Sequence, residues 1–225
     1  MAPTRSTRVV KFTQARIVSG KICLMIDAGN TFKYSLNLLL VTHLHEDHIG
    51  RFHTVPEGTL VFLPHASFIL KLKKMNPRVK FIKIPPGKTT KFKQFRIIPF
   101  EVQHSSTTKT YGFRIETGKI KLVWLPDFRN LSEAISYLKN LSHLFINASA
   151  LKKDIEHRDR ERHGQQAVMN SLATLRKNKI KPGVIYLIHY GIGMAPIEVK
   201  TKYVDKQFPE YKILPTWDNK IIQFK

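Results

Sequence analysis

Short apolar runs separated by turn residues recur along the chain, and their spacing predicts many strands and a few helices. The runs at 38–41 and 184–188 are continuously apolar, which is typical of strands buried on both faces. Residues 79–99 alternate apolar and basic side chains, as half-exposed strands do. Further strands are predicted within 8–29 around a turn at 19–21, around the turn at 118–119, and at 59–63, 97–102, 144–146, 212–214 and 220–224.

Helical periodicity marks four other segments. Residues 66–74 and 165–177 each place their large apolar side chains on one side, and a last helix is predicted at about 196–206. Asn130 followed by Glu133 has the spacing of a capping box, so we expect a helix to begin there.

A group of metal-binding side chains directly follows the apolar run at 38–41. Three histidines and an aspartate stand within six residues, namely His43, His45, Asp47 and His48. Residues two apart on an extended chain point the same way, so His43 and His45 can share one ion while Asp47 and His48 turn towards another. The cluster therefore predicts a site for two metal ions.

Other predicted strands also end in residues that bind metals or orient the residues that do. Asp27 ends a strand before a tight turn, and we expect it to act as a ligand or as an acceptor that orients a histidine. His104 follows the strand at 97–102 and suits a third histidine ligand. Asp127 and His189 stand at the ends of two further strands.

The charge of the chain points to a class of partner. Lysine and arginine number 38 against 16 for aspartate and glutamate, which gives a formal net charge of +22. Metal ligation would occupy several of the acidic groups and leave the outer surface still more positive. Such a surface favours a polyanionic partner, most simply nucleic acid or another phosphate-rich ligand.

Length and composition restrict the other possibilities. At 225 residues the chain fits one domain, residues 1–225, with a proper hydrophobic core. No apolar stretch approaches the roughly 20 residues needed to cross a bilayer, and the first residues lack the apolar core of a signal peptide. We therefore expect a cytoplasmic protein without a membrane partner. Cys23 is the one cysteine, so no internal disulfide is predicted.

The segment from Thr42 to His48 resembles the T-H-x-H-x-D-H motif of the metallo-β-lactamase fold superfamily. The resemblance covers essentially the whole chain, including the turn at 215–218 before the final predicted strand. It implies an α/β fold, a single-domain four-layer αββα sandwich with the metal site at the edge of the two sheets.

The same resemblance implies a ligand set. One ion is expected on His43, His45 and His104, and a second ion on Asp47, His48 and His189, with Asp127 bridging the two ions. A water molecule shared by two ions loses a proton near neutral pH and becomes a nucleophile. Histidine-rich ligation favours zinc, while carboxylates in both sites also suit manganese or iron.

Comparison with the branches of this superfamily narrows the expected chemistry. β-Lactamases of this fold typically lack a histidine at position 48 and use a cysteine late in the chain, whereas Cys23 lies early. Nucleases with a large cap domain have many more residues between the positions of Asp127 and His189. The chain most resembles the phosphodiesterase branch, which includes RNase Z.

One local match supports that branch. His163 begins the sequence His-Gly-Gln-Gln-Ala, after a densely charged segment at 150–162. In the phosphodiesterase branch, a histidine so placed donates a proton to the leaving oxygen. The resemblance therefore implies that His163 is catalytic, together with the metal ligand Asp47. The alternative is that His163 only begins the following helix.

The leading hypothesis is a dinuclear metal-dependent phosphodiesterase, a nuclease acting on RNA or single-stranded DNA. The alternative is a small-molecule hydrolase of the same fold, most plausibly a cyclic-nucleotide phosphodiesterase. Glu46 stands where RNase Z has glycine, and no glycine-rich arm for gripping tRNA is visible, which argues against tRNA processing. A basic binding protein without chemistry would require a broken metal site, but every expected ligand is present.

Nucleic-acid contacts are predicted on the alternating basic strands. The backbone of a polymer substrate would follow Lys80, Lys83, Lys88, Lys91, Lys93 and Arg96. A solvated surface without a ligand is the other interpretation of these residues. Relatives in the superfamily often pair near the site, so the resemblance also implies a homodimer.

Overall fold

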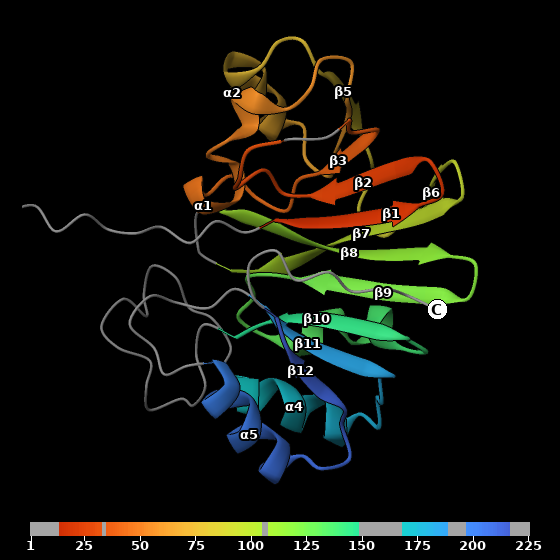
Figure 1. The fold of residues 1–225 in the computed structure, drawn as a ribbon, viewed down its shortest axis with the longest axis vertical. Coiled ribbons are helices and arrows are strands. Elements are labelled where there is room, and N and C mark those ends of the chain that lie inside the picture. Colours follow the sequence, from red (N-terminus) through yellow and green to blue (C-terminus); the bar gives the residue numbers. More distant parts are fainter. Residues whose placement is uncertain (1–13, 33–34, 105–107, 149–167, 189–196, 217–225) are drawn as a thin grey trace, which may run out of the picture.

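A computed structural model of the chain describes residues 14–32, 35–104, 108–148, 168–188 and 197–216. Two β-sheets lie between helices at opposite ends of the molecule (Figure 1). Helix α2 (Ser67–Met75) covers one end, and helices α4 (Val168–Lys177) and α5 (Ile197–Gln207) cover the other. This arrangement is the predicted four-layer αββα sandwich in a single domain.

The first sheet has the order β1-β2-β3-β4-β5 in the described residues. Strands β1 and β2 form an antiparallel hairpin, and strands β2 to β5 run parallel. Parallel strands carry the residues that follow them to one edge of the sheet. The strands are β1 (Ala15–Ser19), β2 (Ile22–Ile26), β3 (Leu38–Leu40), β4 (Leu60–Leu63) and β5 (Lys80–Lys83).

The second sheet has the order β12-β11-β10-β9-β8-β7-β6 across the described part of the chain. Strands β6 to β9 pair antiparallel, and β9 to β12 pair parallel. The strands are β6 (Thr90–Phe92), β7 (Phe95–Gln103), β8 (Lys109–Thr117), β9 (Ile120–Leu125), β10 (His143–Asn147), β11 (Val184–Ile188) and β12 (Ile213–Pro215).

The core consists of three apolar layers, as the sandwich requires. On β2, Leu24 and Ile26 pack between the sheets, while Met25 points to the outer layer under α2. The middle layer also contains Phe113 and Trp124 from the second sheet. A third layer lies between the second sheet and helices α4 and α5. The central strands are therefore buried on both faces, which explains their continuous apolar sequence.

Most predicted strands are confirmed, including the hairpins on both sides of residues 19–21 and 118–119. The predicted strand at 220–224 and the ends of several predicted segments lie outside the described residues. The charged segment at 150–162 also lies outside them. No helix in the described residues has the length and apolar character that crossing a membrane requires.

The helix predicted after Asn130 takes a different form. Residues Leu131–Leu138 form a 3₁₀ helix, η2, rather than an α-helix. Asn130 accepts a hydrogen bond from the Ser132 backbone N–H, as a cap does. The Glu133 carboxylate, however, accepts from the backbone N–H of Gln103 at 2.8 Å, so the predicted capping box is wrong. The backbone N–H of Gln103, at the end of β7, thus binds the Glu133 carboxylate in place of the Asn130 N–H.

We predict that Gly112→Ala destabilises the fold by about 1–3 kcal/mol, which is the usual cost of overpacking. A Cβ atom at Gly112 would lie 2.6 Å from Cε2 of Phe100 and 3.0 Å from Cδ1 of Leu125. Phe100 is buried and stacks on Tyr137 with ring centroids 4.4 Å apart, so it cannot turn away. Urea unfolding measures the loss.

The control is Phe100→Leu with and without Gly112→Ala. The shorter side chain at position 100 makes room for the added methyl group. The double variant should therefore lose less stability than the sum of the two single variants. Simple additivity would show that the contact with Phe100 is not the cause.

Candidate metal centre

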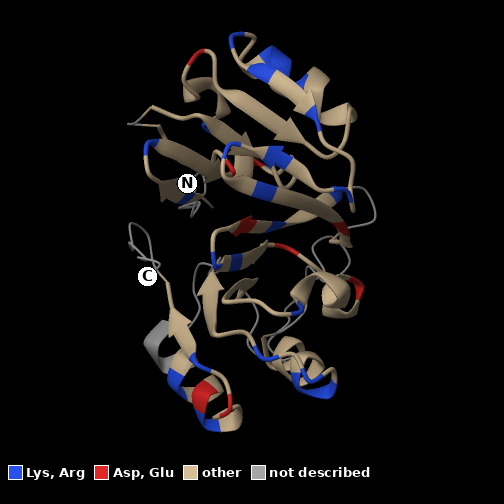
Figure 2. Cartoon of the chain, turned by 90° about the vertical axis from the view of Figure 1, so that its right-hand side faces the viewer, with Lys and Arg blue, Asp and Glu red and all other residues tan. Residues whose placement is uncertain are grey.

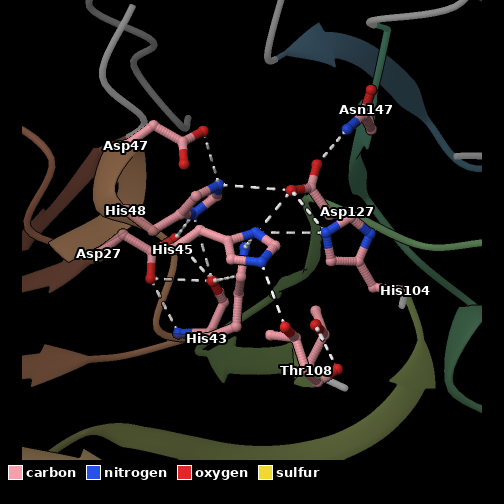
Figure 3. A network of polar contacts seen from close by, with 11 residues as sticks. Asp27, His43, His45, Asp47, His48, His104, Thr108, Asp127 and Asn147 are labelled. Atoms are coloured by element: carbon pink, nitrogen blue, oxygen red, sulfur yellow. Dashed lines mark hydrogen bonds and ion pairs between the residues drawn. The ribbon is translucent and has the colours of Figure 1, made fainter. Parts of the chain in front are cut away.

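The six predicted metal ligands that lie in the described residues, His43, His45, Asp47, His48, His104 and Asp127, converge where the two sheets meet (Figure 3). Asp27 follows β2, His43 follows β3, and Asp127 follows β9, all at the carboxyl ends of parallel strands. His104 follows β7, which runs in the same direction as β9 because both are antiparallel to β8. Strand direction therefore collects residues that are far apart in the sequence.

Four of these residues form one compact group. Single ligand atoms from His43, His45, His104 and Asp127 all lie within 4.8 Å of one another. The His43 Nε2 to His45 Nδ1 distance is 3.0 Å, and Asp127 Oδ2 lies 3.5 Å from His43 Nε2 and 3.6 Å from His104 Nε2. Ligand atoms around tetrahedral zinc are about 3.3 Å apart, given Zn–N bonds of about 2.0–2.1 Å. The donor set and its spacing therefore fit a divalent metal ion.

A second group lies on the other side of Asp127. Helix α1 (Glu46–Ile49), a single turn, carries Asp47 and His48. His48 Nε2 lies 3.5 Å from Asp47 Oδ2 and 3.6 Å from Asp127 Oδ2. The extended chain thus ends at His45, and the helical turn directs the next two side chains away from the first group. Asp127 Oδ2 lies between the two groups, as a bridging ligand must.

Asp27 is fully buried and holds the metal loop from behind. Its carboxylate accepts hydrogen bonds from the Thr42 backbone N–H at 2.8 Å and from the Thr42 hydroxyl at 2.9 Å. The same carboxylate lies 2.8 Å from Nδ1 of His48. Donation from this Nδ1–H fixes the tautomer of His48 and leaves the Nε2 lone pair for a metal.

Thr42 extends this control to His43. Its hydroxyl lies 3.0 Å from Nδ1 of His43 and donates its own proton to Asp27. An Nδ1–H of His43 therefore donates to the hydroxyl oxygen, and Nε2 again keeps its lone pair. One buried carboxylate thus orients two histidines, one of them through Thr42. The Asp27 backbone has a φ of 63°, a conformation that aspartate and asparagine tolerate better than most residues.

The surroundings set the protonation of these groups. Burial lowers the pKa of His43 well below its usual value, which favours the neutral form that a metal requires. Burial acts against protonation of His48 too, but the charges and hydrogen bonds of Asp27 and Asp127 raise its pKa well above the usual value. Burial raises the pKa of Asp27, and His48 counteracts that rise. The two carboxylates thus favour the protonated form of His48, and a metal ion there would compete with a proton.

Asn147 is a member of the site that the sequence reasoning did not include. It ends β10, is buried, and its amide donates a hydrogen bond to Asp127 Oδ1. This bond directs Oδ2 of the same carboxylate towards the histidines. A polar residue directly after the apolar run 144–146 was the signal that could have revealed it.

The structure does not bring the remaining predicted site residues to the metal centre. His163 and His189 lie outside the described residues. The six predicted nucleic-acid contacts are all exposed, but they do not share one face, because Lys80 and Lys83 are three residues apart on β5. Arg96 forms an ion pair of 3.8 Å with Glu116.

Comparison with known proteins agrees with this geometry. A family model described as "Beta-lactamase superfamily domain" matches residues 32–190, more than half of the chain. No curated protein sequence matches the chain significantly.

Three solved structures illustrate the similarity in fold. The metallo-β-lactamase fold protein YhfI from Bacillus subtilis has a TM-score of 0.73 at 17% identity, covering 89% of this chain and 87% of that one. A diphosphatase from the PhnP family has a TM-score of 0.68 at 18% identity, covering 93% and 83%. The short form of human tRNase Z has a TM-score of 0.59 at 13% identity, covering 80% and 86%.

We predict that Asp27→Asn weakens metal binding by about 10–100-fold, as loss of an orienting carboxylate typically does. The asparagine amide donates where the carboxylate accepts, so it cannot satisfy Thr42 and His48 together. Competition with a chromogenic chelator measures the affinity. Asp205→Asn is the matched control, because it removes the same charge from an exposed position on α5. Equal affinities in the two variants would refute the orienting role.

We further predict that Asn147→Leu lowers metal affinity at least about tenfold, because Asp127 loses the donor that directs Oδ2. Asn76→Leu provides the control, since Asn76 is another buried amide and donates to the Val55 carbonyl at 2.9 Å, away from the site. The control should lose stability but bind metal normally. If both variants bind metal equally, the bond from Asn147 does not position Asp127.

Proposed function

The chain belongs to the β-lactamase superfamily, and from that membership we propose that it is a dinuclear metal-dependent phosphodiesterase, a nuclease acting on RNA or single-stranded DNA. The fold is that of metal-dependent hydrolases. The observation that carries the proposal is the position of Asp127 Oδ2, 3.5–3.6 Å from His43, His48 and His104. A carboxylate oxygen so placed is shared by two groups of ligands.

The predicted site residues would have distinct roles in this reaction. His43, His45 and His104 would hold one ion, and Asp47, His48 and His189 the other, with Asp127 between them. Two divalent ions, zinc by the preference of this donor set, would supply Lewis acidity and a nucleophile at neutral pH. Asp27 and Asn147 keep the ligands oriented before substrate arrives, so little reorganisation is needed. His163 would donate the proton to the leaving oxygen.

A polyanionic substrate agrees with the distribution of charge. Residues 58–100 contain no aspartate or glutamate, and their lysines are exposed. In the view of Figure 2, lysines and arginines recur over α2 and the strands that follow it. Polymers of phosphate gain affinity from such surfaces by releasing counterions. The tRNase among the similar folds is named for its action on such a polymer.

A small phosphorylated molecule, most plausibly a cyclic nucleotide, is the alternative substrate. The diphosphatase among the similar folds supports this candidate. Salt distinguishes the two classes, because affinity for a polymer falls steeply as salt rises and affinity for a small substrate does not.

The test is a cleavage panel with zinc or manganese added. It compares labelled single-stranded RNA, single- and double-stranded DNA, precursor tRNA and cyclic mononucleotides. We expect cleavage of single-stranded polymers, and its loss in His48→Ala. His163→Ala should reduce cleavage by about 10²–10⁴-fold, the usual contribution of a general acid.

A substrate with a good leaving group serves as the control for His163. Bis(p-nitrophenyl) phosphate releases p-nitrophenolate, which needs no proton, so His163→Ala should cleave it nearly as fast as the unaltered protein. Equal losses on both substrates would exclude the general-acid role. Turnover of cyclic mononucleotides alone would replace the nuclease by the small-molecule enzyme.

A further inference from the structure

The edge of the first sheet that carries the metal loop also carries a second group of polar residues. Strands β3 and β4 are parallel neighbours, and Leu40 pairs with Phe62. His43 follows Leu40 by three residues, and His65 follows Phe62 by three residues. Adjacent strands are about 4.8 Å apart. The topology therefore places His65 beside the metal loop, one strand further along the edge.

Ser67 fixes the orientation of the His65 ring. The Ser67 backbone N–H donates to Nδ1 of His65 at 3.2 Å, and the Ser67 hydroxyl lies 2.6 Å from the same nitrogen. Because Nδ1 accepts, the proton of the neutral ring is on Nε2. Within the described residues, nothing accepts from this Nε2–H. His65 is half-buried and thus offers a fixed donor at the rim of the site.

Lys71 places a positive charge at the same rim. Its Nζ donates to the backbone carbonyl of Leu44 at 3.1 Å, and Leu44 stands between His43 and His45. The lysine lies on the exposed side of α2, while Phe68 and Leu72 bury the other side. An ammonium group has three donors, so two remain for a ligand. No acidic residue occurs between Gly58 and Phe100 to neutralise this charge from within the segment.

We propose that His65, which Ser67 holds in place, and Lys71 form an anion subsite that binds a second phosphate of the substrate, next to the one at the metals. The subsite combines the Nε2–H donor of His65 with the ammonium charge of Lys71, which is suitable for a phosphate oxygen. This proposal rests on the proposed function and makes its substrate more specific. The substrate would carry at least two phosphates, with the neighbouring phosphate of an oligonucleotide as the occupant.

Binding without catalysis tests the subsite first. Fluorescence anisotropy measures the affinity of a labelled single-stranded oligonucleotide with chelator present, over a series of salt concentrations. Lys71→Met should weaken binding about 5–20-fold and reduce the slope of log affinity against log salt by about 0.7, the share of one phosphate contact. His65→Ala at pH 8 should weaken binding without a change in slope, because a neutral donor is lost.

Lys119→Met is the matched control. Lys119 is exposed in the turn between β8 and β9, at the opposite edge of the second sheet from Asp127. Its removal lowers the total charge by the same amount and should leave affinity nearly unchanged. If all three variants bind as the unaltered protein does, or if Lys119→Met weakens binding as much as Lys71→Met, the subsite is refuted.

Kinetics distinguish failure of the subsite from failure of the proposed function. Lys71→Met and His65→Ala should raise KM for the oligonucleotide 5–20-fold and leave bis(p-nitrophenyl) phosphate, which has one phosphate, unaffected. Equal losses on both substrates, or weaker zinc binding in the Lys71 variant, would mean that Lys71 only supports the metal loop.

Absence of cleavage of every phosphodiester would refute the proposed function, while the anisotropy series would still decide on the subsite. If diphosphate inhibits the enzyme in a Lys71-dependent way and the oligonucleotide does not bind, the occupant of the subsite is not a polymer.

Discussion

The buried carboxylate of Asp27 is the constraint on which the centre depends. A charge without access to water is costly unless it is hydrogen-bonded, and Asp27 is satisfied by the Thr42 backbone, the Thr42 hydroxyl and His48. Satisfying it fixes the metal loop against β2 and selects the tautomers of two histidines. The left-handed backbone at Asp27 is therefore maintained by the contacts that prepare the site.

The sandwich creates the site because two sheets bring their edges together. The first sheet contributes the loop after β3, and the second contributes His104, Asp127 and Asn147 from the ends of β7, β9 and β10. The middle apolar layer holds the sheets together, so the ligand positions depend on packing remote from them. Asp127 is directed by Asn147 from its own sheet and faces histidines from both. Stability and metal binding are thus coupled in this fold.

Charge is distributed unequally around this centre. The metal site itself concentrates carboxylates and histidines, whereas residues 58–100, which include β4, α2, β5 and β6, contain basic residues and no acidic ones. This positive charge on α2 would attract the polyanionic substrate that we propose. Lys71 joins the two regions, because it lies on α2 and contacts the metal loop.

The sequence by itself determined the family motif from Thr42 to His48, the buried strands and the positions of Asp27, His104 and Asp127 at strand ends. These features are local, since a continuous apolar run and a turn residue are visible in a short window. The 3₁₀ form of η2 was not visible in the sequence pattern, and Glu133 accepts its hydrogen bond from Gln103, which lies 30 residues away in the chain. The roles of Asn147, and the position of His65 and Lys71 beside the metal loop, likewise required the tertiary structure. The roles of these residues follow from strand register and from the contact between the sheets, which no single segment of sequence specifies.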